Sequence, residues 1–333
     1  MKHGNISVFV PHNGCPHQCS FCSQKSITGV HYQPTPDDVD NAVNAALSGR
    51  KLYDYEIAFF GGSFTAIDRD YMISLLKAAY KYVQNGTVTG IRLSTRPDAI
   101  SREILEILKS YGVTAIELGA QSMCDDVLEK NMRGHTAADV VNASRLIKEY
   151  GFSLGLQMMT GLYGSSREKD ICTAERIISL SPDTVRIYPT VTIRNTVLGR
   201  LFESGEYVPD TLAESVELCA FLLKLFMQNN IEVIRLGLHY SEELDRDMLS
   251  DNYHPAFREL CENKLFYDMF LEEAKRKNIT GGDVAVTVSP CAVSKFVGQK
   301  RSNIINLSKL GYNIKIVQDV SLPAYRIKVI QCC

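Results

Sequence analysis

The strongest constraint on the fold is a regular alternation of short apolar runs with helix-like segments over the first two thirds of the chain. Parallel strands need a long crossover connection, usually a helix, so repeated strand–helix units favour a parallel sheet. The runs are apolar rather than alternating, which is typical of strands covered on both faces. Six units predict an α/β fold built as a partial (β/α)6 barrel, because a full barrel needs eight. The expected strands are residues 6–10, 56–60, 91–95, 113–118, 152–159 and 184–188.

Two of the intervening helices have clear start signals. Thr35 followed by Pro36 is typical of an N-cap and the first helical residue. Thr136 and Asp139 have the spacing of a capping box, in which each residue bonds the backbone of the other. We therefore expect helices to begin at these two places.

The composition is that of a globular protein, with 45% hydrophobic and 22% charged residues. No stretch reaches the roughly 18–20 apolar residues that cross a bilayer, and the N-terminus lacks the apolar core of a secretory leader. We therefore expect a cytoplasmic protein with no membrane partner, whose cysteines are metal ligands or thiols rather than disulfides. The cysteines without ligand spacing are expected to be buried: Cys124, Cys172, Cys219, Cys261 and Cys291.

Three cysteines near the N-terminus, Cys15, Cys19 and Cys22, lie within eight residues. Thiolates are soft ligands that suit zinc or an iron–sulfur cluster. A structural zinc site and a [4Fe–4S] cluster held only by protein both take four ligands. The fourth cysteine lies far along the chain, so a four-iron cluster held here would keep one iron open for a small chelating molecule. The alternatives are three structural cysteines, or a zinc site completed by His12 or His17.

The spacing C-x3-C-x2-C, with Phe21 directly before Cys22, resembles the signature of radical S-adenosylmethionine (SAM) enzymes. The resemblance implies that Cys15, Cys19 and Cys22 are catalytic metal ligands of a [4Fe–4S] cluster, with SAM bound at the open iron. It also implies reductive cleavage of SAM to methionine and a 5′-deoxyadenosyl radical, which abstracts hydrogen from a substrate. The electron would come from a reductant such as flavodoxin or ferredoxin.

In sheets of this kind, ligands bind at the carboxyl ends of the strands. Gly61 and Gly62 end the expected second strand, and glycine permits a close approach of the backbone. The pair resembles the family's Gly-Gly motif, which implies backbone contact with the amino group of SAM. Ser63 stands where the family usually has glutamate, and we include it among the candidate cofactor contacts.

Polar residues and glycines recur at the ends of the later strands, and together they would line one opening of the partial barrel. By the same resemblance, Gln121 and Gln157 are candidates for the ribose hydroxyls, and Arg133 for the carboxylate, since arginine suits bidentate recognition. Gly161 and Gly164 would let the backbone approach the adenine. The candidate cofactor-binding residues are Phe21, Gly61, Gly62, Ser63, Ser94, Arg96, Gln121, Arg133, Gln157, Gly161 and Gly164.

Two branches of the superfamily are most similar. Residues 118–122, 133–136 and 186–196 resemble the radical domain of the Elongator catalytic subunit, a tRNA wobble-uridine modifier, more than oxygen-independent coproporphyrinogen III oxidase. The resemblance covers about residues 5–260, so we expect a radical SAM partial-barrel domain over residues 1–260. The cysteine spacing is shorter than in Elongator, and its acetyltransferase domain has no counterpart, so acetyl chemistry is not expected.

Residues 261–333 are expected to form a small C-terminal α/β extension. Residues 281–333 hold seven Lys or Arg and two Asp, a balance of +5, which favours a nucleic-acid contact. Residues 296–304 resemble the core of a KH module, in which a Gly-x-x-Gly loop joins two helices and clamps the RNA backbone. Arg301 replaces the second glycine, so Lys300 and Arg301 are the candidate nucleic-acid contacts. A cap over the barrel is the alternative.

Three functions remain open at this point. The first is a radical SAM enzyme that acts on RNA, plausibly tRNA. The second is the same catalyst acting on a small molecule such as a tetrapyrrole. The third is a non-catalytic iron–sulfur or zinc protein that binds RNA. RNA that co-purifies with the protein would separate the first two, and formation of methionine and 5′-deoxyadenosine would exclude the third.

Overall fold

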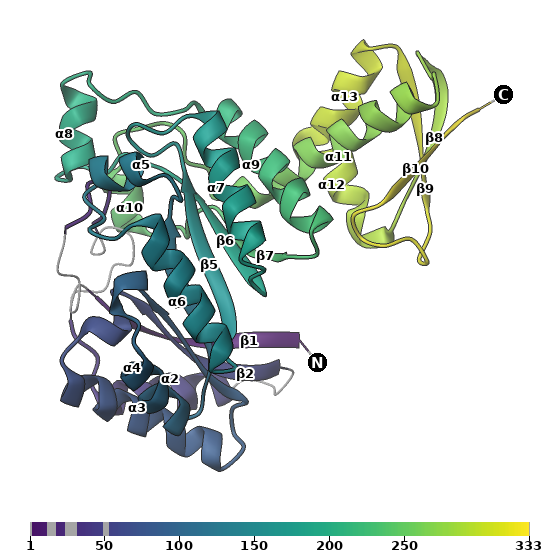
Figure 1. The fold of residues 1–333 in the computed structure, drawn as a ribbon. Helices are drawn as coiled ribbons and strands as arrows, with labels where there is room; N and C mark the ends of the chain where they lie inside the picture. The colour runs from purple at the N-terminus through teal and green to yellow at the C-terminus, as the bar shows by residue number, and fades with distance from the viewer. Residues whose placement is uncertain (1, 12–17, 24–31, 49–52, 333) are drawn as a thin grey trace.

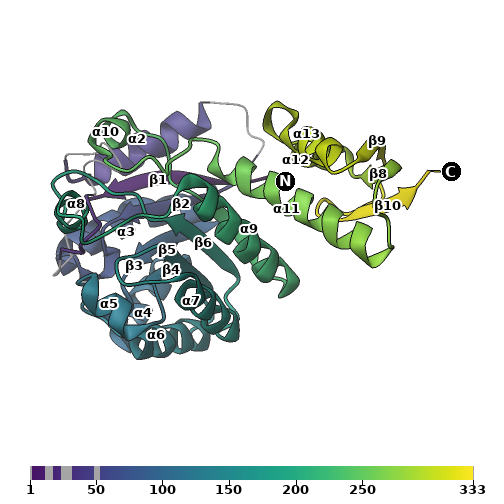
Figure 2. The ribbon, with the colours of Figure 1, turned by 90° about the horizontal axis from the view of Figure 1, so that it is seen from above.

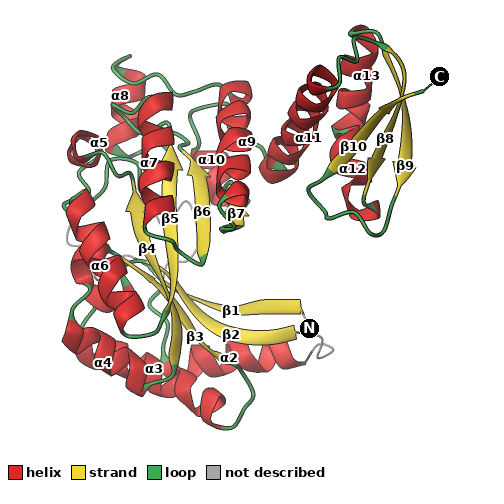
Figure 3. Cartoon of the chain, turned by 45° about the vertical axis from the view of Figure 1, so that its right-hand side comes forward, coloured by secondary structure: helices red, strands yellow, loops and turns green. Residues whose placement is uncertain are grey.

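The computed structural model describes residues 2–11, 18–23, 32–48 and 53–332, and a curled parallel sheet dominates it (Figure 1, Figure 3). Its seven strands pair in sequential order, each parallel to the next, so the predicted partial barrel is confirmed. The seventh strand, which the sequence also predicts at residues 231–235, follows the six predicted units and extends the half-barrel by one. The strands are β1 (Lys2–Val10), β2 (Tyr53–Gly61), β3 (Gly90–Thr95), β4 (Val113–Gln121), β5 (Ser153–Thr160), β6 (Thr184–Pro189) and β7 (Glu232–Leu236).

Helices cover the outer face of this sheet, and the main hydrophobic core lies between the two layers (Figure 3). Among the described residues, no helix is long and apolar enough to cross a membrane. The helices of this part are α2 (Pro36–Leu47), α3 (Arg69–Gln84), α4 (Arg102–Ser110), α5 (Asp125–Lys130), α6 (Ala137–Glu149), α7 (Arg167–Ser179), α8 (Val197–Glu203), α9 (Leu212–Gln228) and α10 (Glu242–Asp247).

Both predicted helix starts are confirmed. At the start of α2, the Thr35 backbone N–H donates to the carboxylate of Asp38 at 2.8 Å. At the start of α6, the Thr136 N–H donates to Asp139 at 2.7 Å, and the Asp139 N–H donates back to the Thr136 hydroxyl at 3.3 Å. These bonds satisfy backbone groups that a helix end would otherwise leave unpaired.

The inner face of the half-barrel carries buried charges, although the expected strands are mostly apolar runs in the sequence. Glu56 and Glu117 are buried there, and the side chains of Arg92 and Arg186 are each only 12% exposed. Each of these four charged residues lies in a strand with several apolar residues, so the sequence pattern of the strand is mainly apolar. A buried charge of this kind persists only when it is paired.

The C-terminal part has a three-stranded mixed sheet and its own hydrophobic cluster. Helix α11 joins it to the half-barrel (Figure 1, Figure 2): its Phe257 and Leu265 pack in the main core, whereas its Phe266 and Phe270 pack in the second cluster. The boundary expected at residues 260 and 261 therefore falls inside one continuous helix. The elements are α11 (Phe257–Arg276), β8 (Gly282–Val288), α12 (Val293–Val297), α13 (Ser302–Lys309), β9 (Tyr312–Gln318) and β10 (Ile327–Gln331).

The expectation that the spare cysteines are buried is wrong for two of them. Cys219 and Cys261 are buried and Cys124 is half-buried, but Cys172 and Cys291 are exposed. Cys172 lies on α7 at a position that faces away from the sheet, so sequence spacing alone does not report the burial of a single cysteine.

Candidate active site

A cavity of about 650 Å³ opens where the strands of the half-barrel end. Its walls come from the loop after β1, from the last residues of β2, β3 and β4, and from β5. This is the edge of a parallel sheet at which ligands bind. Nine of the predicted cofactor residues line it together with Cys19 and Cys22: Phe21, Gly61, Gly62, Ser63, Ser94, Arg96, Gln121, Arg133 and Gln157.

Ser20, in the middle of the cysteine loop, is hydrogen-bonded to the residue after α5 and to the start of α8. The Ser20 backbone N–H donates to the carbonyl of Asn131 at 3.1 Å, and the Ser20 hydroxyl donates to the Asn131 side chain at 2.8 Å. The Ser20 carbonyl in turn accepts from the N–H of Leu198 at 2.8 Å. These bonds hold Cys19 and Cys22 at the cavity wall. Cys15, like the zinc-ligand candidates His12 and His17, lies outside the described residues.

Gly61 is required where β2 meets β1. Its φ is +113°, and a Cβ added there would lie 2.9 Å from the carbonyl oxygen of Val10, which is closer than real Cβ contacts allow. The next N–H, of Gly62, donates to the same carbonyl at 2.8 Å. The Gly-Gly turn is thus packed against the strand that leads into the cysteine loop, and Gly62 faces the cavity.

The guanidinium of Arg133 lies against the cysteine loop. It donates to the sulfur of Cys19 at 3.0 Å and to the carbonyl of Gly119 at 2.7 Å, and it lies 6.0 Å from the centre of the Phe21 ring. Arg96 donates to the carbonyl of Arg133 and so holds its backbone. These contacts hold the Arg133 side chain beside the cysteine loop.

Gln121 presents an unsatisfied acceptor at the cavity. Its Oε1 is buried and has no hydrogen-bond partner among the described residues. The residue has a left-handed backbone, with φ of 64°, where the pairing of β4 with β5 shifts by one residue. Buried polar groups are normally paired, so an unpaired one on a cavity wall points to a polar ligand.

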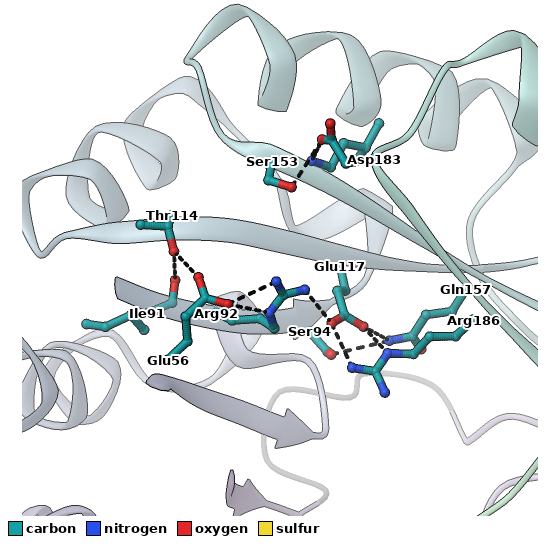
Figure 4. A network of polar contacts seen from close by, with 11 residues as sticks. Glu56, Ile91, Arg92, Ser94, Thr114, Glu117, Ser153, Gln157, Asp183 and Arg186 are labelled. Atoms are coloured by element: carbon teal, nitrogen blue, oxygen red, sulfur yellow. Dashed lines mark hydrogen bonds and ion pairs between the residues drawn. The ribbon is translucent and has the colours of Figure 1, made fainter. Parts of the chain in front are cut away.

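A network of charges crosses the inner face of the half-barrel beside this cavity (Figure 4). Glu117 on β4 accepts from Arg186 on β6 at 2.9 Å and from Arg92 on β3 at 3.2 Å. Burial alone would raise the pKa of Glu117, but the bonds to Arg186 and the charges of both arginines hold it below its usual range. Gln157, which lines the cavity, donates to Glu117 at 3.1 Å and to Ser94 at 3.3 Å. The network therefore sets the orientation of a cavity side chain.

The structure does not bring Gly161 and Gly164 to this cavity. The Gly161 N–H donates to Asp170 at 2.9 Å, and its carbonyl accepts from the Tyr207 hydroxyl at 2.8 Å. The Gly164 carbonyl accepts from Lys169 at 2.8 Å. Both glycines belong to the loop between β5 and α7, whose backbone is held by residues of α7 and by Tyr207.

Several lining residues were not among the sequence-based candidates. Four of them lie within two residues of a candidate, and the fifth lies in the loop after β6. They are Gln18, Ser23, Thr95, Gly119 and Asn195. The first four could have been found by extending each motif by one or two residues. Asn195 has a left-handed backbone, with φ of 62°, and lies in a loop that carries no cofactor motif.

The fold and the cavity define a half-barrel enzyme of the class that binds a cluster and a nucleotide-like cofactor at its strand ends. The Radical SAM superfamily profile matches residues 9–174, and the Radical_SAM C-terminal domain profile matches residues 182–266. The chain belongs to the radical SAM superfamily and is an enzyme. The family uses a [4Fe–4S] cluster and SAM, and these are its cofactors.

The curated relatives that the chain resembles are named as tRNA uridine(34) acetyltransferases or as Elongator complex protein 3. The chain is 29% identical to the tRNA uridine(34) acetyltransferase of Dehalococcoides mccartyi over 61% of this chain and 52% of that protein. It is 31% identical to human Elongator complex protein 3 over 67% of this chain and 46% of that protein. The chain therefore spans about half the length of the curated relatives it matches.

Solved structures support the fold. The Methanocaldococcus infernus Elp3 with an N-terminal deletion superimposes with a TM-score of 0.61 at 20% identity, over 84% of this chain and 64% of that one. Streptococcus suis SuiB bound to S-adenosylmethionine superimposes with a TM-score of 0.52 at 15% identity, over 73% of this chain and 55% of that one. At these identities the likeness concerns the fold alone.

The described residues fit the two cofactors. Cys19 and Cys22 supply two of the three thiolates of the motif at the cavity wall. Gln121 offers an acceptor without a partner, as a ligand with hydroxyl or amino groups requires. The volume of about 650 Å³ lies in the range of cofactor sites.

Gly62→Val is expected to weaken SAM binding and spare the cluster. The added side chain would enter the cavity, and overpacking of roughly 1–3 kcal/mol corresponds to a loss of about tenfold or more in affinity. The measurement is the change that SAM induces in the EPR spectrum of the reduced cluster. Ala45→Val, which also introduces a valine but on the exposed side of α2, is the control. A normal SAM response in Gly62→Val would show that the turn is only structural.

Proposed function

We propose that this enzyme cleaves SAM reductively and takes a hydrogen atom from an RNA substrate of the tRNA class. The observation that carries the proposal is the cavity in which Cys19 and Cys22 meet the Gly-Gly turn, Arg133 and the unpaired Gln121. The similarity to tRNA uridine(34) acetyltransferases at about 30% identity supports tRNA as the substrate class. Acetyl transfer is not part of the proposal.

Cys15, Cys19 and Cys22 would hold the cluster. The chemistry available with it bound would be one-electron reduction of SAM by a flavodoxin- or ferredoxin-type reductant, with the sulfur–C5′ bond broken to give methionine and a substrate hydrogen completing 5′-deoxyadenosine. The other site residues of this chain would bind and orient SAM. Gly62 would meet the amino group of SAM through its backbone. The candidate roles of Arg133 and Gln157 are the carboxylate and the ribose.

Arg133 lies where it can serve both cofactors. One Nη atom donates to Cys19 and the other to a carbonyl, while Nε is buried without a partner among the described residues. An arginine held this rigidly can present its remaining donor to a carboxylate. Gln157 donates to Ser94 at 3.3 Å, and together they would form the hydroxyl-binding part of the proposed SAM site.

The C-terminal unit offers a cationic turn for RNA. Lys300 and Arg301 join α12 to α13, are exposed, and have no recorded carboxylate partner in the described part of the chain. Both have left-handed backbones, with φ of 52° and 62°. Lys295, by contrast, is engaged by Glu262 at 3.1 Å. The turn therefore places two available cations side by side at the start of a helix, where phosphate is favoured.

The turn has a defined shape. Gly298 has φ of 79°, and a Cβ there would lie 2.5 Å from the hydroxyl of Ser302. Asn303 donates to the carbonyl of Asn263 on α11 at 2.8 Å and to that of Phe296 at 3.0 Å. These contacts fix the turn relative to the helix that also packs in the half-barrel core.

Reversing both charges of the turn, Lys300→Glu with Arg301→Glu, is expected to weaken tRNA binding and leave substrate-free SAM cleavage unchanged. Each phosphate contact with single-stranded RNA contributes about 0.7 to the slope of log K against log salt, so losing two should reduce the slope by about 1.4. The measurement is filter binding of bulk tRNA at several salt concentrations. Lys77→Glu with Lys109→Glu, at exposed positions on α3 and α4, makes the same change of charge elsewhere.

Wild-type protein that binds tRNA with no salt dependence, or not at all, would contradict the RNA substrate and favour a small molecule. Equal losses in both double variants would mean that total charge, rather than this turn, governs binding. A loss of basal SAM cleavage in the turn variant alone would indicate a cap that supports the barrel.

A further inference from the structure

Two arginines lie side by side on the inner face of the half-barrel, beyond the cavity. The pairing of β6 with β7 shifts at one point, so that Ile234 is an extra residue and Arg186 lies opposite Arg235. Gly119 on β4 and Gln157 on β5 continue the same row across the sheet, and both line the cavity. A bulge of this kind re-aims a side chain, and such bulges are frequent beside active sites.

The charges of this inner face do not balance. Three arginines, Arg92, Arg186 and Arg235, lie here with two carboxylates, Glu56 and Glu117, and the recorded ion pairs involve only Arg92 and Arg186. Arg186 and Arg92 are bonded to those carboxylates, whereas Arg235 has no ion pair with a described residue. Like charges directly opposite each other on neighbouring strands are destabilising, and a bound anion would offset the second guanidinium of this pair.

Arg235 is only partly satisfied. Its Nε donates to the carbonyl of Gly237 at 2.8 Å, which fixes the guanidinium against its own loop and leaves both Nη groups without a recorded bond in the part of the chain that the structure describes. Burial lowers the pKa of Arg235, and the charge of Arg186 adds to that effect. A half-buried guanidinium with unused N–H donors is suited to bind an oxyanion.

Three hydroxyl groups beside β6 and β7 also lack partners. Thr190 Oγ1, Thr192 Oγ1 and the Tyr253 hydroxyl are buried and have no hydrogen bond to any described residue. The segments that carry them pair with each other, since the Leu249 N–H donates to the carbonyl of Thr192 at 2.8 Å. The charge of Arg235 acts on Tyr253, opposing the rise that burial causes in the pKa of that tyrosine. A cation and unpaired hydroxyls therefore meet at this end of the sheet.

We infer that Arg235, with Tyr253, forms an anion subsite that holds an oxyanion of the substrate while its reacting carbon lies in the cavity. The inference rests on the proposed function, in which the oxyanion is a phosphate of the RNA next to the target nucleotide. Neighbouring strands are about 4.8 Å apart, so Arg235 lies roughly 10 Å along the sheet from Gln157. One nucleotide can span that separation. In a small-molecule substrate the same subsite would hold a carboxylate.

The test is equilibrium binding of uridine 5′-monophosphate and uridine to the SAM-loaded, cluster-containing enzyme, measured by titration calorimetry. The two probes differ only in the phosphate. A charge-assisted contact makes the monophosphate bind about tenfold or more tighter to the wild type. The preference disappears in Arg235→Gln and returns in part in Arg235→Lys. Arg246→Gln, which removes an exposed arginine of α10, keeps the full preference.

Other outcomes separate the subsite from the RNA proposal. If neither uridine compound binds but a dicarboxylic probe such as glutarate does, and Arg235→Gln abolishes that binding, the subsite stands and the RNA substrate is wrong. If the wild type binds uridine and its monophosphate equally, or Arg235→Gln keeps the preference, the subsite is wrong while RNA remains possible. Absence of charge-dependent binding by any probe to the wild type also overturns it. The wild-type comparison does not depend on how well a variant folds.

Discussion

Cys19→Ala is expected to lose the [4Fe–4S] cluster and all SAM cleavage. The motif supplies three thiolates, and the variant leaves two, so the cluster loses a ligand that the cavity wall cannot replace. The described residues contain no group of three or more metal-ligating side chains that could take over. Iron and sulfide analysis of anaerobically reconstituted protein gives the result, with about four irons in the wild type and few in the variant.

Cys172→Ala is the matched control for this change. Cys172 is exposed on the outer helix α7 and lies apart from the cavity, so its variant should keep both iron and activity. Four irons retained in Cys19→Ala, or tightly bound zinc in the wild type, would contradict the cluster assignment.

Glu117→Gln is expected to destabilise the protein by about 3–5 kcal/mol, because removing one partner of a buried ion pair leaves the other charge uncompensated. Glu117 is 1% exposed and is bonded by Arg186 and Arg92. Glutamine keeps the shape but cannot neutralise two guanidinium groups. Urea unfolding followed by circular dichroism at neutral pH measures the loss. Glu103→Gln, which breaks an exposed pair with Arg69, is the control and should change stability little.

The pH dependence of this effect has a definite sign. The pKa of Glu117 is lower in the folded protein than its ordinary value. The Glu117 charge therefore contributes fully to the free energy of unfolding above the ordinary glutamate pKa, and this contribution is lost as the pH falls through the pKa of the folded state. The difference in stability between wild type and Glu117→Gln should therefore shrink on acidification. A difference that stays constant into the acid range would mean that packing, rather than charge, dominates.

The strands and helices of the half-barrel could be predicted because each signal is local. An apolar run, a capping residue such as Thr136 and a glycine at a strand end act over a few residues. The inner charge network could not be predicted in this way. Glu117 meets Arg92 and Arg186, which are 25 and 69 residues away in the chain, so no spacing in the sequence reveals the pairs.

The same distinction applies to the candidate site. The rule that ligands bind at strand ends brought Gly62, Gln121 and Gln157 together correctly at the cavity. Gly161 also follows a strand, but its backbone is bonded to Asp170 on α7 and to Tyr207 after α8, so position at a strand end was not sufficient. Arg235 escaped notice because its inward direction depends on a one-residue shift in strand pairing that composition does not report.

The expected boundary between residues 260 and 261 falls within α11, which packs in both hydrophobic clusters, and no local signal in the sequence reports such shared packing. The helix connects the cationic turn to the half-barrel, because Asn303 donates to the carbonyl of Asn263 on α11. Contacts between RNA and Lys300 or Arg301 would then be transmitted through Asn303 and α11.

The most direct test of the account is the yield of methionine and 5′-deoxyadenosine from anaerobically reconstituted protein supplied with SAM and a one-electron reductant, with and without tRNA. The account predicts equal amounts of the two products, a rate that rises when tRNA is added, and no product from Cys19→Ala. Protein that holds a full cluster and binds SAM, yet forms no 5′-deoxyadenosine under either condition, would contradict it.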